Sequence, residues 1–423
     1  MMNLKSILGA ASVEPAAPFP LHALPPQDWA RLAAEGPLPV VALWADRGRI
    51  YALLGDDASP LAVASPLVDG AYAAMSPARP EAAWFERLAH DLQGVAAIGA
   101  PDERPAVDHG RGGNGSPEWP RFIETQGEGL HQAALGPVHG LIGPAAHHRL
   151  TLDGARIARL EMRLGYTHRG VLGLMAGKSC RAAARFAARL TADATVAHSL
   201  AFATAAEAAS AVEVPPRAAA LRAVMAAAER SGAEIAILGT LASGRWEARL
   251  EAARERIAEA ALACFGHRLM MDAVVPGGLA ADCDEASLPA LAAALAGAEG
   301  IAAAFARLAD RFDPAIAARI QARAGAAAEA RQLMDAVLEA LPEPPVSVPL
   351  PMASGMGFGA APSARGTIWH WLDLTSGYIA GVFIADPAAL LWPGLEAEAA
   401  GGDIEDLPML SASLGLSVPG ADL

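Results

Sequence analysis

The segment Gly165-Tyr166-Thr167-His168-Arg169-Gly170 separates a strand pattern from a helix pattern. Before it, residues 150–152 and 160–164 alternate apolar and polar side chains around Asp153-Gly154, which predicts a β-hairpin. After it, from about residue 172 to 341, apolar residues recur at three- and four-residue spacing, which predicts a bundle of long helices. Proline and glycine interrupt this helical pattern at 215–216, 276–278 and 313–314. These six residues therefore mark the change from the hairpin to the helices.

The regions on either side of this domain are more mixed. Apolar runs at 40–44 and 50–54 flank Asp46-Arg47-Gly48 and predict a hairpin, and 81–92 has helical spacing. The glycine-rich stretch 108–117 is typical of a linker. Strands are expected again at 367–374 and 378–384, before a polar, glycine-containing tail. The prediction is an α+β protein: a small α+β domain over 1–108, a linker over 109–125, and a mainly helical bundle with peripheral β-hairpins over 126–423.

Composition limits the classes of function. The chain has 423 residues, of which 53% are hydrophobic, and a formal net charge of −14, which argues against nucleic-acid binding. The apolar stretches 194–212 and 288–306 are interrupted by charged residues or proline, so we expect core helices and no transmembrane segment. The first residues lack the pattern of a secretory signal. Three unpatterned cysteines, Cys180, Cys264 and Cys283, indicate no disulfide framework and favour the cytoplasm.

Several separated motifs occur in a specific order. They are Gly127-Glu128-Gly129-Leu130-His131, Gly136-Pro137-Val138-His139-Gly140, the segment 165–170, Val214-Pro215-Pro216-Arg217, Pro276-Gly277-Gly278-Leu279 and Ala364-Arg365-Gly366. Together they resemble the large subunit of membrane-bound (group 4) nickel-iron hydrogenases and its relative, the quinone-site subunit of respiratory complex I. Residues 83–92 and 101–105 resemble the end of the small complex I subunit often fused ahead of this scaffold.

The metal ligands of that family are missing. A nickel-iron centre needs four thiolates in two Cys-x-x-Cys pairs, because soft sulfur holds these metals. The four positions fall here on Thr191, Ala194, Ser417 and Gly420. Asp386-Pro387 superficially mimics the second pair but better matches an earlier aspartate–proline step. The glutamate that hydrogenases use to pass protons corresponds to Leu172. We therefore expect no metal in this chain and no hydrogen activation.

The complex I resemblance implies a quinone-type pocket. Its histidine corresponds to His139 or His147, whose spacing leaves the choice open, and its tyrosine position falls on Cys180, a poorer hydrogen-bond donor. With Arg365, these residues are the candidate cofactor-binding set. His139, His168 and Asp193 are the candidate catalytic groups, because histidine and carboxylate can handle protons.

Structural roles compete with each of these assignments. The histidines could instead bond backbone carbonyls, and Asp193 could be an ion-pair partner of Arg189 or Arg365. Cys180 could be a small core hydrophobe. Gly355-Met356-Gly357-Phe358-Gly359 lacks the features of a phosphate loop, so we expect a flexible turn there.

The resemblance implies a nickel-free subunit of a multi-subunit, membrane-associated oxidoreductase with a structural, electron-transfer or quinone-site role. It would bind no cofactor directly, quinone being the one candidate, while a partner subunit carries an iron–sulfur cluster. Its partners would be that small iron–sulfur subunit and membrane subunits resembling ion pumps. They would hold it at the cytoplasmic, inner face of the cell membrane. The alternatives are a hydrogenase assembly scaffold without catalysis and a quinone-reactive subunit.

Overall fold

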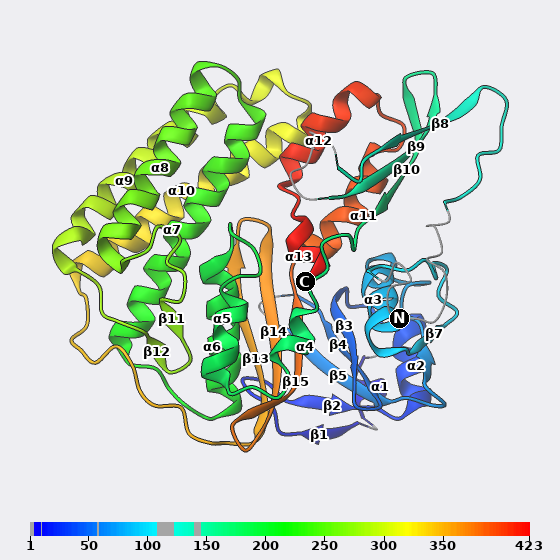
Figure 1. Ribbon diagram of the computed structural model, residues 1–423. Helices are drawn as coiled ribbons and strands as arrows, with labels where there is room; N and C mark the ends of the chain where they lie inside the picture. Colours follow the sequence, from blue (N-terminus) through cyan, green and yellow to red (C-terminus); the bar gives the residue numbers. More distant parts are fainter. Residues whose placement is uncertain (1–3, 10, 57–58, 108–121, 139–144) are drawn as a thin grey trace. The chain divides into compact units, whose positions relative to one another are not determined.

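The structure is a computed structural model that describes residues 4–9, 11–56, 59–107, 122–138 and 145–423. The chain forms two compact units. Unit 1 comprises Met1–Gly170, Ala385–Glu405 and Val418–Leu423, and unit 2 comprises Val171–Ile384 and Asp406–Ser417. The boundary expected at residue 108 falls outside the described residues and stays a prediction. The α+β class is confirmed, since both units contain helices and sheets (Figure 1).

Unit 1 begins with a five-stranded sheet in the order β1-β2-β5-β4-β3. Its strands are β1 (Ser12–Glu14), β2 (Leu21–Ala23), β3 (Val40–Asp46), β4 (Arg49–Leu54) and β5 (Leu61–Pro66). The predicted hairpin is confirmed: Asp46 pairs with Arg49, and the two turn residues Arg47 and Gly48 both have positive φ, as a tight hairpin requires. The helices α1 (Leu4–Leu8), α2 (Pro26–Glu35) and α3 (Ala83–Gln93) complete this part, and β6 (Ala71–Ala73) pairs with β7 (Ala96–Ile98).

A second sheet in unit 1 contains the other predicted hairpin. It has the order β10-β9-β8, formed by β8 (Leu130–Leu135), β9 (His147–Asp153) and β10 (Arg156–Arg163). The helix α11 (Ala388–Ala399) packs on β10, and Glu396 accepts a hydrogen bond from Met162 N at 2.5 Å. Arg104 connects the amino-terminal part to this sheet, because it pairs with both Asp102 and Glu161. Unit 1 ends with α13 (Val418–Asp422).

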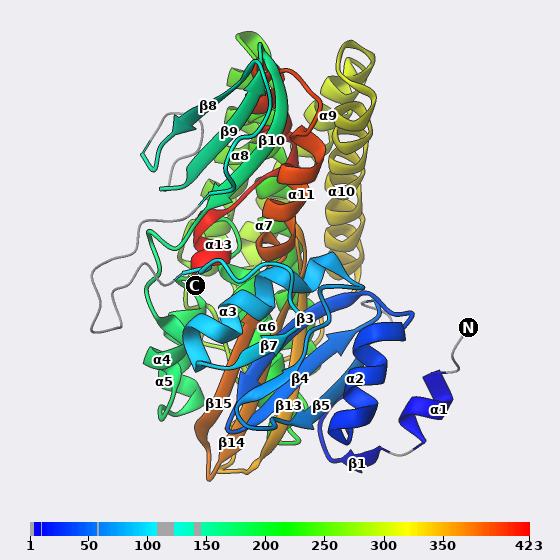
Figure 2. The same cartoon turned by 90° about the vertical axis from the view of Figure 1, so that its right-hand side faces the viewer.

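Unit 2 is built on four long helices that run side by side (Figures 1 and 2). They are α7 (Pro216–Leu241), α8 (Arg245–Phe265), α9 (Leu288–Ala306) and α10 (Pro314–Glu339). Leu221, Leu250, Leu295 and Ile320, one from each helix, are completely buried in their shared core. By length and composition the stretch Glu285–Ala306 could cross a membrane, but α9 contributes buried side chains to this core.

The remaining helices of unit 2 are shorter. They are α4 (Val171–Met175), α5 (Cys180–Ala187), α6 (Thr195–Ala209) and α12 (Leu407–Leu414). The described residues also form the 3-10 helices η1 (Pro80–Ala82), η2 (Glu285–Ser287), η3 (Ala309–Arg311) and η4 (Ile404–Asp406). Because α12 and α13 occupy the end of the chain, the tail expected there is corrected to two short helices. Gly415 and Pro419 are residue types typical of turns, so the sequence did not predict these helices. In the structure Gly415 ends α12 and Pro419 lies in the first turn of α13.

A buried ion pair fixes the proline–glycine–glycine turn of unit 2. This turn connects β11 (Val274–Val275) with β12 (Gly278–Leu279). Arg222 on α7 pairs with Glu207 on α6 at 2.6 Å and donates to the carbonyl oxygen of Gly278. Glu207 also accepts from Gly277 N at 2.7 Å. Both side chains are buried, so each needs the other to offset the loss of hydration.

The expected flexible turn at 355–359 is wrong. These residues begin β13 (Gly355–Ser363), which forms a sheet with β14 (Gly366–Thr375) and β15 (Tyr378–Ala385). A Cβ on Gly357 would lie 2.0 Å from Ala205 O, and one on Gly359 would lie 2.0 Å from Ala201 O. The glycines are therefore needed because α6 lies directly against the strand, a role that glycine plays where backbones approach closely.

Candidate functional site

Three of the four positions that the resemblance assigns to metal ligands belong to unit 2. Thr191 and Ala194 precede α6, and Ser417 follows α12. All three are at most 7% exposed. The Thr191 hydroxyl is buried and has no hydrogen-bond partner among the residues that the structure describes. These positions offer two hydroxyls and a methyl group, none of which is a soft ligand.

The fourth position, Gly420, belongs to unit 1 and lies against a carboxylate. A Cβ built on Gly420 would lie 2.6 Å from Asp386 Oδ2 and 2.8 Å from Oδ1. Asp386 is buried, and its Oδ1 accepts a hydrogen bond from Ala388 N at 2.7 Å at the start of α11. A cysteine at position 420 could therefore not be accommodated unless Asp386 moved.

The residues present do not fit a nickel-iron centre. Such a centre requires thiolates, and the four corresponding positions contain no sulfur. Across the described part of the chain, no group of three or more His, Cys, Asp or Glu residues is arranged to hold a metal ion. We therefore derive no chemical step through a metal.

Asp193 and Arg365, two of the predicted site residues, form an ion pair. Arg365 Nη1 lies 2.5 Å from Asp193 Oδ2, and Nη2 lies 3.4 Å from Oδ1. The Arg365 side chain is almost completely buried, whereas half of the Asp193 side chain is exposed. Arg189, the other arginine considered for Asp193, pairs with Asp272 at 2.6 Å instead. Asp193 thus brings a negative charge to the segment 191–194 of unit 2.

Of the other predicted residues, Cys180 belongs to unit 2, and His147 and His168 belong to unit 1. Cys180 begins α5 and is buried, which raises the pKa of its thiol to about 11. His168 donates from Nδ1 to the carbonyl oxygen of Asp422, the backbone-bonding role considered for these histidines. The His147 ring stacks on Phe122, with centroids 5.2 Å apart. His139 lies outside the described residues, so its part in a quinone-type pocket stays a prediction.

The carboxyl-terminal segment is held in place by Asp422. Its carboxylate accepts hydrogen bonds from Gly165 N at 2.7 Å, from Thr167 N at 2.9 Å and from the Thr167 hydroxyl at 2.6 Å. The motif 165–170 therefore has a structural function: it binds the end of the chain within unit 1. Three hydrogen bonds to one buried carboxylate are a strong anchor, because charge strengthens each of them.

Unit 2 contains a buried pair of histidines that the sequence does not predict. His198 on α6 and His370 on β14 are completely buried, and His198 Nδ1 lies 3.1 Å from His370 Nε2. One ring nitrogen of this pair must carry a hydrogen and the other must accept it. Nothing in the sequence connects two histidines that are 172 positions apart.

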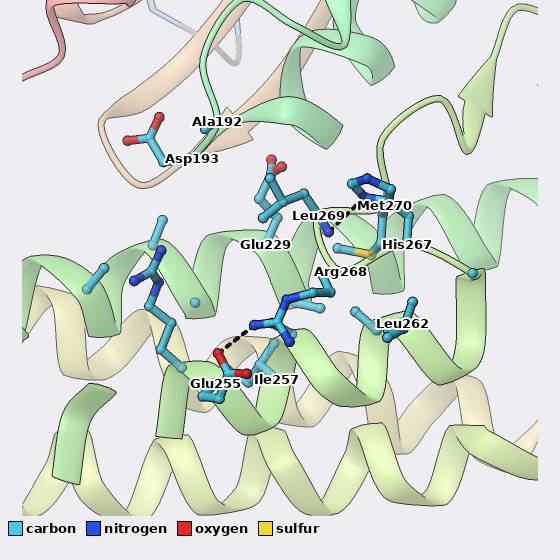
Figure 3. Close-up of a pocket in the computed structure, with 18 residues that line it drawn as sticks. Ala192, Asp193, Glu229, Glu255, Ile257, Leu262, His267, Arg268, Leu269 and Met270 are labelled. Carbon is cyan, nitrogen blue, oxygen red and sulfur yellow. Dashed lines mark hydrogen bonds and ion pairs between the residues drawn. The ribbon is translucent and has the colours of Figure 1, made fainter. Parts of the chain in front are cut away.

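A pocket of about 570 Å³ lies in unit 2 next to the segment 191–194 (Figure 3). Its walls come from α7, α8, the loop 266–270 and residues 192–193. Glu229 of α7 and Asp193 both line it. Glu229 Oε2 accepts from Val196 N at 2.6 Å, and Oε1 accepts from Ala197 N at 2.9 Å. One carboxylate thus binds the first turn of α6, where the helix dipole favours a negative charge.

The sequence resembles subunits of hydrogenases and of NADH-quinone oxidoreductases, and the resemblance predicted from the motifs is confirmed. The chain is 29% identical over 196 residues to formate hydrogenlyase subunit 5 of Escherichia coli, covering 40% of this chain and 33% of that protein. It is 32% identical over 162 residues to an NADH-quinone oxidoreductase subunit of Dehalococcoides mccartyi, covering 37% and 44%. Membrane-bound hydrogenase subunit alpha of Pyrococcus furiosus is 28% identical over 155 residues, covering 36% of each chain.

These matches span less than half the length of each of these curated relatives. No protein-family model matches the chain. Among solved structures, a chain of the membrane-bound sulfane sulfur reductase, an archaeal respiratory membrane complex, aligns with a TM-score of 0.63 at 17% identity. The alignment covers 70% of this chain and 99% of that one. This likeness concerns the fold alone.

Proposed function

We propose that this chain is a nickel-free, hydrogenase-like large subunit of a membrane-associated, multi-subunit oxidoreductase related to complex I. The similarity to subunits of both hydrogenases and NADH-quinone oxidoreductases supports the class. One observation carries the nickel-free part: none of the four ligand positions contains sulfur, and a carboxylate stands against the fourth. The scaffold is retained without the residues that a nickel-iron centre needs.

In this proposal the chain has a structural or electron-transfer role beside a small iron–sulfur subunit. Membrane subunits resembling ion pumps would hold it at the cytoplasmic face of the membrane. Its own residues near the former ligand segment are hydrogen-bonding and charged groups: Thr191, Asp193 and Arg365. Groups of this kind suit a neutral redox carrier such as a quinone, whose carbonyl oxygens accept hydrogen bonds, better than a soft metal ion.

Purification from native membranes tests the proposal. We expect the tagged full chain to co-purify in stable, equimolar amounts with an iron–sulfur subunit and with integral membrane subunits. Transient association with hydrogenase maturation factors, and with no membrane subunit, would contradict it and favour the assembly-scaffold alternative. A tagged soluble protein from the same cells controls for non-specific retention of membrane proteins.

The quinone-reactive role requires a separate experiment. The purified complex is assayed for electron transfer to a soluble quinone after substitution of His139→Ala, His147→Ala or His168→Ala. If a histidine binds quinone, its replacement should raise the KM for quinone. If all three variants retain the wild-type KM and rate, the quinone-site role should be abandoned, whereas the structural role would be unaffected.

A further inference from the structure

The pocket beside α6 is hollow because its helical walls carry small side chains. Ala228, Gly232 and Ala236 follow one another along α7, and Ala258 and Ala261 face the same space from α8. These residues leave room for water between the two helices, and the pocket also has polar groups for water to bind. Glu229 is the acidic residue that α7 places on this wall. Its carboxylate is therefore next to both solvent and the start of α6.

Glu229 has hydrogen-bond donors but no cationic partner. Its two oxygens accept from Val196 N and Ala197 N, and no Lys, Arg or His forms an ion pair with it within the described residues. A carboxylate that is removed from bulk water without a neutralising cation favours its protonated form. Burial accordingly raises the pKa of Glu229 to about 7, although the two backbone hydrogen bonds lower it.

The charges around Glu229 come from every wall of the pocket. Asp193 raises the pKa of Glu229 through repulsion, and Arg365, which is paired with Asp193, lowers it. On α8 and the following loop, Arg268 pairs with Glu255 at 2.5 Å and Arg254 pairs with Glu251 at 3.3 Å. His267 Nδ1 accepts from Leu269 N at 3.0 Å. The cations of the pocket are thus already engaged, as Figure 3 shows for Arg268 and Glu255.

We propose that Glu229 is a proton-binding site that exchanges protons with solvent through this pocket, and that proton uptake there weakens the attachment of the first turn of α6. The ligand is a proton from water, and no electron transfer is involved. In the ionised form both oxygens accept from backbone N–H groups. In the protonated form one oxygen carries a hydrogen, so one of the two amides loses a strong acceptor. The inference does not depend on the proposed function, because it concerns the ionisation of this chain alone.

The experiment is an infrared pH titration of the full chain that follows the band of protonated carboxyl groups. Over about pH 5 to 9, where ordinary Asp and Glu side chains stay ionised, we expect a component with a midpoint near neutrality. This component should disappear in Glu229→Gln. It should persist in Glu255→Gln, the matched control, because Glu255 is an exposed acid of the same pocket whose pKa is lowered by Arg268. Identical titrations of the wild type and Glu229→Gln would overturn the proposal.

A second variant tests the site without altering Glu229. Asp193 is half-exposed, so Asp193→Asn should fold. It removes a repulsive charge and releases Arg365 from its ion pair, and both changes favour ionised Glu229. The midpoint should therefore shift to lower pH. An unchanged midpoint would show that the titrating group is not beside Asp193.

Hydrogen exchange tests the consequence for α6. After correction for the intrinsic pH dependence, the protection of the Val196 and Ala197 amides should fall several-fold when Glu229 is protonated. The amides in the middle of α6 should retain their protection. Equal protection of both amides on either side of the midpoint would contradict the proposed coupling.

Discussion

Gly420 lies so close to the carboxylate of Asp386 that a Cβ on Gly420 would be 2.6 Å from Asp386 Oδ2. Gly420 lies in the short helix α13, and its φ does not require glycine. The reason for glycine there is thus a side-chain carboxylate.

This contact predicts that Gly420→Ala is destabilising. Alanine normally favours a helix over glycine by about 1 kcal/mol, but the overlap with Asp386 should cost about 1–3 kcal/mol. Gly394→Ala in α11 is the control, because nothing lies within 4 Å of a Cβ at that position. Denaturant unfolding should show a loss of stability only for Gly420→Ala.

The same contact predicts coupling between the two positions. In a double-mutant cycle, Gly420→Ala should cost less when Asp386 is replaced by alanine, because the clashing carboxylate is then absent. Additive effects of the two substitutions would contradict the steric explanation.

Replacing Thr191 should have the opposite effect on stability from replacing Gly420. Its buried hydroxyl has no partner within the described residues, so Thr191→Val should be neutral or stabilise the protein by about 1 kcal/mol. Thr195→Val is the control, because the Thr195 hydroxyl donates to Thr191 O at 3.3 Å and its loss should destabilise. Thermal unfolding of both variants checks the difference. A marked loss of stability in Thr191→Val would mean that its hydroxyl has an essential partner.

Cys180 should react slowly with thiol reagents. Burial raises the pKa of its thiol to about 11, so roughly a thousandth of it is thiolate at pH 8. Cys283 is partly exposed and should be alkylated first. Mass spectrometry after brief treatment of the native protein with iodoacetamide gives the order. Faster modification of Cys180 would contradict its burial and would favour an active role for the thiol.

The stability of the chain should depend on pH through Glu229. Its pKa is about 7 in the folded state and 4.5 in the reference state. Between these pH values the folded state therefore binds a proton that the unfolded state does not. This contribution to stability is fully present below pH 4.5 and is lost as pH rises to about 7. The difference in unfolding free energy between wild type and Glu229→Gln should therefore decrease over this interval. A difference that grows with pH would contradict the assignment.

Local sequence signals predicted most of the secondary structure. Asp46-Arg47-Gly48 and Asp153-Gly154 identified both hairpins, because positive φ at their turns restricts the residue types. The proline breaks at 215–216 and 313–314 located the first residues of α7 and α10. Gly357 and Gly359 misled the prediction, because the same residue type serves turns and close backbone contacts. Only the position of α6 distinguishes these roles.

The site was less accessible to sequence reasoning. Asp193 was correctly considered as a partner of Arg365, since opposite charges suggest pairs, but the choice over Arg189 depended on the fold. Glu229 resembles any acidic residue of a long helix. Its surroundings come from segments at 193–197 and 254–270, which the sequence cannot place together. The motifs identified a family resemblance, whereas the residues that surround Glu229 could be identified only from the folded structure.

The metal content of the protein, purified from its native membranes after growth with added nickel, tests the central claim most directly. A subunit without sulfur at Thr191, Ala194, Ser417 and Gly420 should contain no stoichiometric nickel by elemental mass spectrometry. An equimolar amount of nickel that remains with this chain after separation from its partners would contradict the account.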